Sequence, residues 1–227
     1  MTARRVLVFD MDGVLVDVTG SYRETIRRTV KHFTGRDISP EFIQGLKNAG
    51  GWNNDWELSR KIVRDFGVEI DYRTVVERFQ SLFFGDGSDG LVYREKWIAQ
   101  PGLLERFSRS YRLAIFTGRL QEEARVTLDR FAKGLAFDPV IANDDVANGK
   151  PAPDGLLRII ELAGGGKLWY VGDTVDDARS ARAAGVPFIG VAAPDNPRRA
   201  ELVSLFRTEK AMAVVDDINQ LENVLES

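Results

Sequence analysis

Short apolar runs alternate with longer amphipathic segments along the second half of the chain. The apolar runs are rich in β-branched and aromatic residues, and they read RLAIFTG, DPVIAND, KLWYVGD, PFIGVA and MAVVDD. Segments between them, such as LQEEARVTLDRFAKG and VDDARSARAAG, repeat apolar residues at helical spacing. Strands that alternate with helices in this way are typical of βαβ units. The pattern therefore predicts an α/β fold built on a doubly wound parallel sheet.

The alternation stops between residues 19 and 98, where no convincing central strand is found. This stretch instead contains the helical patterns YRETIRRTVKHFTG, SPEFIQGLKNAGG, WELSRKIVRDFG and YRTVVERFQSLFFG. We interpret it as a helical domain inserted after the first strand. Residues 1–17 and 99–227 are then expected to form the α/β core, and residues 18–98 the inserted domain.

The composition excludes several classes of function. The chain has no cysteine, which excludes disulfides, thiolate nucleophiles and cysteine zinc sites. Its single histidine, His32, lies in a helical pattern with basic neighbours, so we expect a solvated position and no histidine triad. A net charge of -3 with interspersed signs does not indicate a nucleic-acid partner.

Targeting signals are also absent from the pattern. There is no apolar run of about 18 residues to predict a membrane span, and the apolar run near the N-terminus is too short for a signal peptide. We therefore expect a cytoplasmic protein without a membrane partner. The composition leaves its oligomeric state open.

The first apolar run ends on two carboxylates, in VLVFDMDGVLVDV. Asp10 and Asp12 share one face if the chain stays extended, because side chains alternate with period two. Two carboxylates so close repel unless a cation, a shared proton or distinct chemical duties separate them. The alternative is a plain junction between strand and turn, in which Gly13 supplies an unusual φ angle.

Later strands end in polar groups suited to a phosphate or a metal. Thr117 and Gly118 follow LAIF, where a hydroxyl and backbone amides before a helix can bind an anion. Lys150 lies in the loop ANGKPAPDG, and Asp173 and Asp177 lie in GDTVDD. The structural alternatives are a helix-capping threonine, a surface lysine and acids that favour a first helical turn. The triplet GGGKLWY is not read as a phosphate loop, because it closes a helix and opens a strand.

Carboxyl ends of parallel strands meet at one edge of a sheet, so these residues should gather there. A cluster of carboxylates without histidine or cysteine suits Mg²⁺, which prefers oxygen ligands and phosphate oxygens. The lysine and the hydroxyl would then bind the remaining charge of a phosphate. The sequence thus predicts Mg²⁺ as the cofactor.

At these residues the sequence resembles the haloacid dehalogenase-like superfamily of phosphohydrolases. The family's four motifs appear in order as DMDGVLVD, FTG, GKPAPD and GDTVDD. The resemblance implies a Rossmann-like core with an α-helical cap of the C1 type, formed here by the inserted domain. It also implies a Mg²⁺-dependent phosphatase that hydrolyses a small phosphorylated metabolite through an aspartyl-phosphate intermediate.

The resemblance further implies roles for individual residues. Asp10 corresponds to the nucleophile, and Asp12 to the general acid that protonates the leaving oxygen and then activates water. Thr117 and Gly118 would bind the transferring phosphoryl group, while Lys150 would neutralise its charge and hold Asp10.

The metal ligands implied by the resemblance are Asp10, Asp12 through its main-chain carbonyl, and Asp173. Asp177 would assist through a water or by supporting these ligands. Dehalogenating relatives lack the second aspartate, so Asp12 favours a phosphotransferase.

Other enzymes of the family share most of these motifs. Phosphonate-cleaving relatives use a cap lysine for a Schiff base, for which the candidates are Lys31, Lys47, Lys61 and Lys96. A sugar-phosphate mutase would share every core motif. A catalytically silent sensor of a phosphorylated ligand is an alternative of a different class, although the intact motif residues argue against it.

We expect substrate choice to depend on the stretch LKNAGGWNNDWELS. Its glycines free the backbone, and Trp52, Asn53 and Asn54 could cover the site, since loops on a rigid scaffold often carry recognition. The alternative is a connection in which Asn54 or Asp55 caps the next helix. Arg119 is expected either to contact the substrate or to be a surface charge at a helix start.

Overall fold

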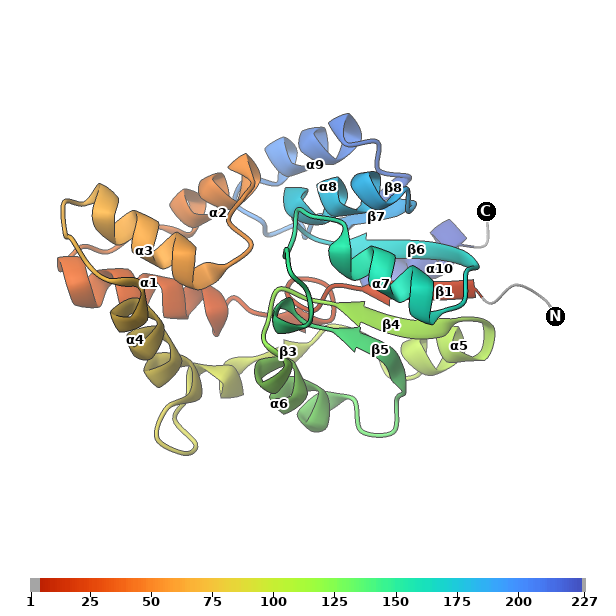
Figure 1. Cartoon of the computed structure of the whole chain (residues 1–227), viewed down its shortest axis with the longest axis horizontal. Coiled ribbons are helices and arrows are strands. Elements are labelled where there is room, and N and C mark those ends of the chain that lie inside the picture. The colour runs from red at the N-terminus through yellow and green to blue at the C-terminus, as the bar shows by residue number, and fades with distance from the viewer. Residues whose placement is uncertain (1–4, 226–227) are drawn as a thin grey trace. The chain divides into compact units, whose positions relative to one another are not determined.

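The computed structural model describes residues 5–225 and divides the chain into two compact units (Figure 1). The first unit, called the core unit below, contains Met1–Val16 and Trp97–Ser227, and the second, the helical unit, contains Asp17–Lys96. Two short strands, β2 (Val16–Asp17) and β3 (Lys96–Trp97), lie where the chain passes between the units. These junctions lie one or two residues from the boundaries expected from the sequence.

The core unit contains a six-stranded sheet with the order β5-β4-β1-β6-β7-β8, and its described pairings are parallel. This confirms the predicted fold class. The order runs outward from β1 in both directions, so β1 marks the point where the connections reverse. The strands are β1 (Arg5–Phe9), β4 (Arg112–Phe116), β5 (Phe137–Ile141), β6 (Lys167–Gly172), β7 (Phe188–Val191) and β8 (Ala213–Val215).

Helices follow the strands of the core unit, as the alternating pattern predicts. They are α5 (Leu103–Ser110), α6 (Gln121–Phe131), α7 (Asp154–Leu162), α8 (Val175–Ala184), α9 (Arg199–Thr208) and α10 (Leu221–Leu225), with 3₁₀ turns η2 (Asn143–Asp145) and η3 (Ile218–Gln220). The glycine triplet 164–166 lies between α7 and β6, at a helix end as expected.

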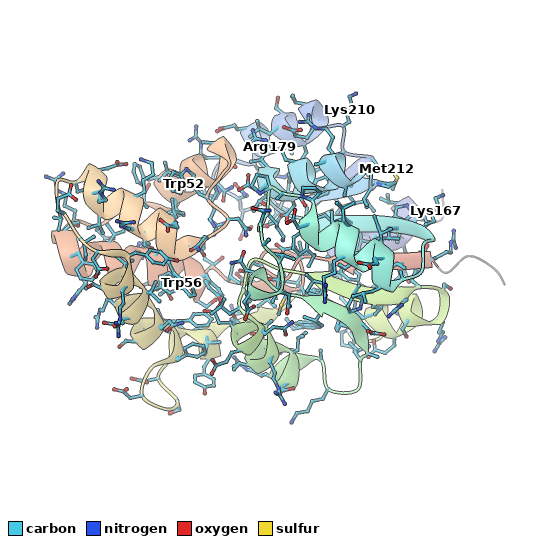
Figure 2. All side chains as sticks on the ribbon, viewed as in Figure 1. Trp52, Trp56, Lys167, Arg179, Lys210 and Met212 are labelled. Carbon is cyan, nitrogen blue, oxygen red and sulfur yellow. The ribbon has the colours of Figure 1, made fainter. Side chains whose placement is uncertain are left out.

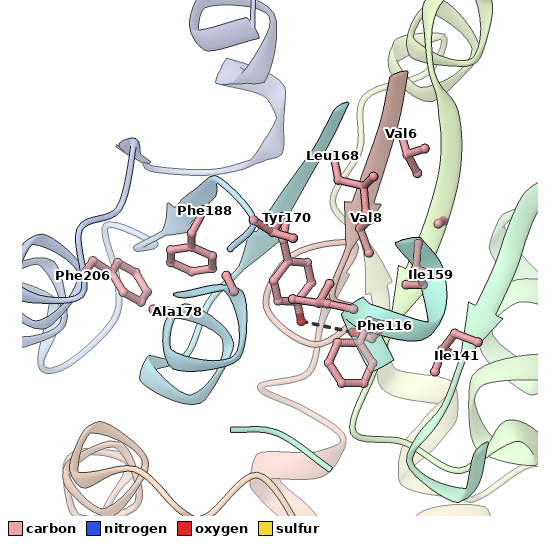
Figure 3. Packing of buried hydrophobic residues seen from close by; sticks show 14 of the residues in the cluster. Val6, Val8, Phe116, Ile141, Ile159, Leu168, Tyr170, Ala178, Phe188 and Phe206 are labelled. Carbon is pink, nitrogen blue, oxygen red and sulfur yellow. Dashed lines mark hydrogen bonds between the residues drawn. The ribbon is translucent and has the colours of Figure 1, made fainter. Parts of the chain in front are cut away.

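One face of the sheet packs against α7, α8 and α9 (Figure 3). Side chains from strands and helices are fully buried there, among them Val8 and Tyr170 of the central strands, Ile159 of α7 and Phe206 of α9. Removing such side chains from water stabilises a fold by about 1.5–3 kcal/mol each. This packing fixes the strand ends that carry the polar motif residues.

The helical unit contains α1 (Tyr22–Thr34), α2 (Pro40–Ala49), α3 (Asp55–Asp65), α4 (Tyr72–Phe84) and the 3₁₀ turn η1 (Leu91–Arg94). Its core includes an aromatic cluster: the ring centroids of Tyr22 and Phe83 lie 4.3 Å apart, and Phe79 is fully buried beside them. His32 is exposed on α1, as expected. Across residues 5–225, no helix combines the length and the apolar character that crossing a membrane requires.

A close approach between α7 and β4 depends on Gly155. A Cβ built on Gly155 would lie 2.1 Å from the Phe116 ring, which is buried directly before Thr117. Gly155→Ala should therefore lower the free energy of unfolding by about 1–3 kcal/mol, because overpacking forces neighbours out of place. Urea unfolding measures the change. Glu161→Ala, an exposed change in the same helix, is the matched control and should have little effect; equal stabilities of the two variants would contradict the prediction.

Candidate active site

Three motif residues lie at neighbouring strand ends of the core unit. Asp10 follows β1, Thr117 follows β4 and Asp173 follows β6, and β4 and β6 are the two strands paired with β1. The pairing continues past the strands, since the Asp10 amide donates to the Val171 carbonyl at 2.8 Å. The topology thus brings Asp10 together with residues that lie more than one hundred positions further along the sequence.

Lys150 lies at the centre of this arrangement. Its ammonium group is 2.8 Å from Asp10 Oδ1 and 2.7 Å from Asp177 Oδ1, and its side chain is only 1% exposed. The Phe116 and Tyr170 rings lie 4.9 and 5.4 Å from the same nitrogen. Burial alone would lower the lysine pKa, but the two carboxylates raise it above its ordinary value. Lys150 is therefore a buried cation, and the surface alternative is wrong.

Asp177, in the first turn of α8, is held by four donors. Its Oδ1 accepts from Lys150 and from the Tyr170 hydroxyl at 2.6 Å, and its Oδ2 accepts from the Thr174 amide at 2.9 Å and the Thr174 hydroxyl at 2.6 Å. Burial would raise the pKa of this carboxyl, but Lys150 and the hydrogen bonds hold it below its ordinary value. Thr174 also caps α8, because its hydroxyl accepts from the Asp177 amide.

Asp10 has a different electrostatic environment. Burial raises its pKa to about 7, Asp177 and Asp12 act in the same direction, and Lys150 opposes them. The folded protein without a metal therefore favours a proton on Asp10 that the unfolded chain, at an ordinary pKa of 3.8, does not bind at neutral pH. A cation placed beside Asp10 would remove this preference.

Asp12 binds Arg119. The Nε and Nη2 atoms of Arg119 lie 2.7 and 2.6 Å from Asp12 Oδ1, and Nη1 donates to Thr127 Oγ1 at 2.6 Å. The Arg119 side chain is 1% exposed, so the expectation of a surface charge is wrong. The guanidinium nitrogens already bind Asp12 and Thr127, so the structure does not support the expected contact between Arg119 and a substrate.

Thr117 is buried and Gly118 half-buried on the loop between β4 and α6. The Thr117 hydroxyl accepts from the Arg119 amide at 3.2 Å, and α6 begins only at Gln121 after the N-cap residue Leu120. The alternative of a helix-capping threonine is therefore wrong for Thr117.

Three of the four predicted acids are close enough to share a metal ion. One carboxylate oxygen each from Asp10, Asp173 and Asp177 lies within 4.8 Å of the others. The backbone leaves room for them, since a Cβ on Gly13, where φ is +71°, would lie 2.0 Å from Asp173 Oδ2. This set of hard oxygen donors fits Mg²⁺. The Asp12 side chain lies outside the set, which leaves its main-chain carbonyl as the predicted contribution.

The tentative specificity residues belong to the helical unit. Asn54 is the N-cap of α3, where its side-chain oxygen accepts from the Trp56 and Glu57 amides at 2.9 and 3.1 Å. Trp52 lies on the segment between α2 and α3 (Figure 2). The Lys61 ammonium lies 5.7 Å from the centroid of its ring. Asn53 is half-buried beside it.

The four cap lysines considered for a Schiff base differ in burial. Lys31 and Lys61 pair with Asp37 and Asp65 across exposed surface, and Lys96 is exposed. Lys47 is buried and forms an ion pair with Asp55.

Three supporting residues escaped the sequence analysis. Two of them carry a signal in the sequence. Tyr170 is the one hydroxyl-bearing residue in the apolar strand KLWYVG, and Thr174 lies three positions before Asp177, which is the spacing of a capping box. Thr127 lies on α6 without any local signal. Its contact with Arg119 follows only from the packing of that helix.

The fold and the site define an α/β protein with an acidic, oxygen-rich centre at the reversal point of a parallel sheet. A model of the family of haloacid dehalogenase-like hydrolases matches residues 7–191. The chain belongs to this family, which confirms the predicted resemblance and the predicted class of enzyme, a hydrolase.

Individual relatives share moderate identity with the chain. It is 33% identical over 199 residues to an imidazoleglycerol-phosphate dehydratase from Phytophthora nicotianae, covering 84% of this chain but only 44% of that protein. It is 28% identical over 184 residues to a phosphoglycolate phosphatase from Aquifex aeolicus, covering 80% and 81%. A conserved haloacid dehalogenase-like protein of unknown function from Agrobacterium tumefaciens has the same fold, with a TM-score of 0.72, 20% identity and 97% of each chain covered.

The raised pKa of Asp10 predicts a pH-dependent stability. Because the folded pKa of about 7 exceeds the unfolded value of 3.8, the stabilising effect of the bound proton is complete below pH 3.8 and is lost as pH rises through 7. In EDTA, Asp10→Asn should remove the contribution of Asp10 to this pH dependence, so that the free energy of unfolding of the variant falls less between pH 4 and pH 8 than that of the unaltered protein. Urea unfolding from pH 4 to 8 measures it.

The matched control is Asp129→Asn, since Asp129 is a mostly exposed carboxylate on α6. Its pH profile should follow that of the unaltered protein. Superimposable profiles for Asp10→Asn and the unaltered protein would contradict the raised pKa.

The Tyr170 hydroxyl is expected to stabilise the buried Asp177 carboxylate. Tyr170→Phe removes a donor at 2.6 Å and should cost about 1–2 kcal/mol of unfolding free energy, because a buried charge loses part of its solvation. Tyr111→Phe is the control, since Tyr111 is also nearly buried and its ring contacts survive the change. A cost no greater than that of the control would show that the hydroxyl is not needed.

Proposed function

We propose that the protein is a Mg²⁺-dependent phosphatase that hydrolyses a small phosphorylated metabolite through an aspartyl-phosphate intermediate. The observation that carries the proposal is the buried ion pair between Lys150 and Asp10 beside a group of carboxylates. A carboxylate fixed by a cation is a positioned nucleophile, and the same cation can receive the charge of a phosphoryl group.

The charges of the site support a divalent ion. Four carboxylates gather at these strand ends, from Asp10, Asp12, Asp173 and Asp177. Lys150 forms ion pairs with Asp10 and Asp177, and Arg119 forms one with Asp12. Oxygen donors gathered in this way are the ligands that Mg²⁺ prefers. Mg²⁺ bound there would reduce the repulsion between these carboxylates and an anionic phosphate, and it would stabilise the phosphoryl oxygens electrostatically.

The acidic residues of the site have different proposed roles toward the metal. Asp10 and Asp173 would bind the ion, together with the main-chain carbonyl of Asp12. Both oxygens of Asp177 already accept hydrogen bonds from Lys150, Tyr170 and Thr174. We therefore assign Asp177 to fixing Lys150 and completing the acidic environment, in keeping with the assisting role expected from the sequence.

In the first step an Asp10 carboxylate oxygen bonds to phosphorus as the bond between phosphorus and the leaving oxygen breaks. Asp12 gives its proton to that oxygen, which departs as an alcohol. Thr117 and the amides near Gly118 bind the phosphoryl oxygens, and Lys150 balances their charge. In the second step a water gives its proton to Asp12 and bonds to phosphorus, which releases inorganic phosphate and restores the Asp10 carboxylate.

We propose that substrate choice lies with the helical unit. The segment between α2 and α3 contains two glycines with φ of +81° and leaves Trp52 and Asn53 partly exposed. Phosphoglycolate is the first substrate to test, because the Aquifex aeolicus relative is a phosphoglycolate phosphatase. A mutase or a non-catalytic sensor could share the core residues, and the following assay separates them from a phosphatase.

Phosphate release from phosphoglycolate and 4-nitrophenyl phosphate should require Mg²⁺ and stop with excess EDTA. Asp10→Asn should reduce kcat by at least about a thousandfold, because the amide cannot act as the nucleophile. Asp129→Asn, on exposed α6 surface, should retain the activity. Retained turnover in Asp10→Asn would contradict the aspartyl-phosphate route. Binding of a phosphate ester without turnover would favour a sensor, and phosphate transfer between sugar hydroxyls without release would favour a mutase.

A further inference from the structure

Arg119 is a buried cation, and burial of a guanidinium is costly unless it is fully paired. It lies two positions after Thr117, on the loop that follows β4. The simplest surface arginine would extend into solvent, yet this side chain is directed into the core unit and binds residues from two other segments. Its position therefore serves the groups that it contacts.

The contacts of Arg119 join three parts of the core unit. Its side chain binds Asp12, after β1, through Nε and Nη2, and binds Thr127 of α6 through Nη1. Its amide donates to the Thr117 hydroxyl, and its carbonyl accepts from the Asn143 amide at 2.9 Å. One residue thus connects the loop of the predicted phosphate-binding hydroxyl to the predicted general acid.

The contact with Asp12 is asymmetric. Nε and Nη2 both lie close to Oδ1, so these two contacts leave Oδ2 to carry or receive a proton. The Asp12 side chain is 29% exposed, whereas that of Arg119 is 1% exposed. The carboxyl group is therefore held from its buried side and reachable from the other. The carbonyl oxygen of a protonated carboxyl group can still accept these hydrogen bonds, so Arg119 can hold Asp12 in both its protonated and its ionised form.

We propose that Arg119 is a positioning residue that fixes the orientation of Asp12 for proton transfer to the leaving oxygen. The inference rests on the proposed function and adds a residue to it. Proton transfer depends on a donor held within hydrogen-bond reach of its target, and loss of the guanidinium would let the Asp12 side chain rotate. Thr127 supports this role by fixing the far side of the guanidinium.

The test compares esters that differ in their need for a proton. 4-Nitrophenolate leaves readily without protonation, whereas an alkoxide does not. The alkyl ester is phosphoglycolate or glycerol 3-phosphate, whichever the unaltered protein hydrolyses faster. The readout is the ratio of kcat/KM for the alkyl ester to kcat/KM for 4-nitrophenyl phosphate, which reports the step in which the leaving oxygen departs.

Arg119→Met should lower this ratio by about tenfold or more, since a positioned general acid contributes about 10²–10⁴-fold. Asp12→Asn should lower it in the same direction, and adding Arg119→Met to Asp12→Asn should change it little further, because the two residues act as one unit. Arg112→Met is the matched control: Arg112 lies at the start of β4 and binds Asp138, so the ratio should stay unchanged.

Two further variants guard against a simple folding defect. Arg119→Lys keeps the charge with a single point of contact and should restore part of the ratio. Thr127→Val removes the Nη1 partner and should lower the ratio less than Arg119→Met does. Thermal unfolding by circular dichroism shows whether each variant is folded.

Equal losses for both esters, or effects of Arg119→Met and Asp12→Asn that multiply independently, would overturn the positioning role while leaving the phosphatase proposal intact. An unaltered protein that hydrolyses no ester in the presence of Mg²⁺ would overturn the proposed function and the positioning role together.

Discussion

The ion pair of Lys150 with Asp10 and Asp177 joins the strand ends that carry the motif residues. An ammonium group this deeply buried is tolerated only because two carboxylates lie within 2.8 Å of it. Those carboxylates lie far apart in the sequence, after β1 and within α8. Each charged group therefore depends on the others, and the ion pair exists only when the strands and α8 are in place. Folding and the assembly of the site are the same event for these residues.

The fold could be predicted from the sequence because its signals are local. Alternating apolar runs and amphipathic segments indicated the parallel sheet, and their interruption indicated the helical insertion. Asp10, Thr117 and Asp173 could be placed at strand ends for the same reason, since each directly follows an apolar run. The sheet order then brings neighbouring strand ends together without further information from the side chains.

Arg119 shows where such reasoning stops. In the sequence it is an arginine at the start of a helix, and that pattern is usual for a surface charge. Its burial is decided by Asp12 and Thr127, which approach from other elements. Tyr170 is similar: its ring belongs to the apolar core, while its hydroxyl reaches Asp177 and lies 3.2 Å from the Phe116 carbonyl (Figure 3). Packing between different elements decides both contacts: the single hydroxyl in the apolar run marks Tyr170 as unusual, but the sequence does not name the partner of either residue.

The helical unit leaves and rejoins the core unit through adjacent short strands, β2 and β3. Close by, the Ile98 amide donates to the Leu15 carbonyl at 2.9 Å, so the core backbone closes on itself across the insertion. To the core unit, the whole of Asp17–Lys96 is topologically a single long loop, and the entropic cost of a loop grows only slowly with its length. Evolution can therefore lengthen, shorten or exchange this stretch while the lysine-bridged carboxylates keep their places.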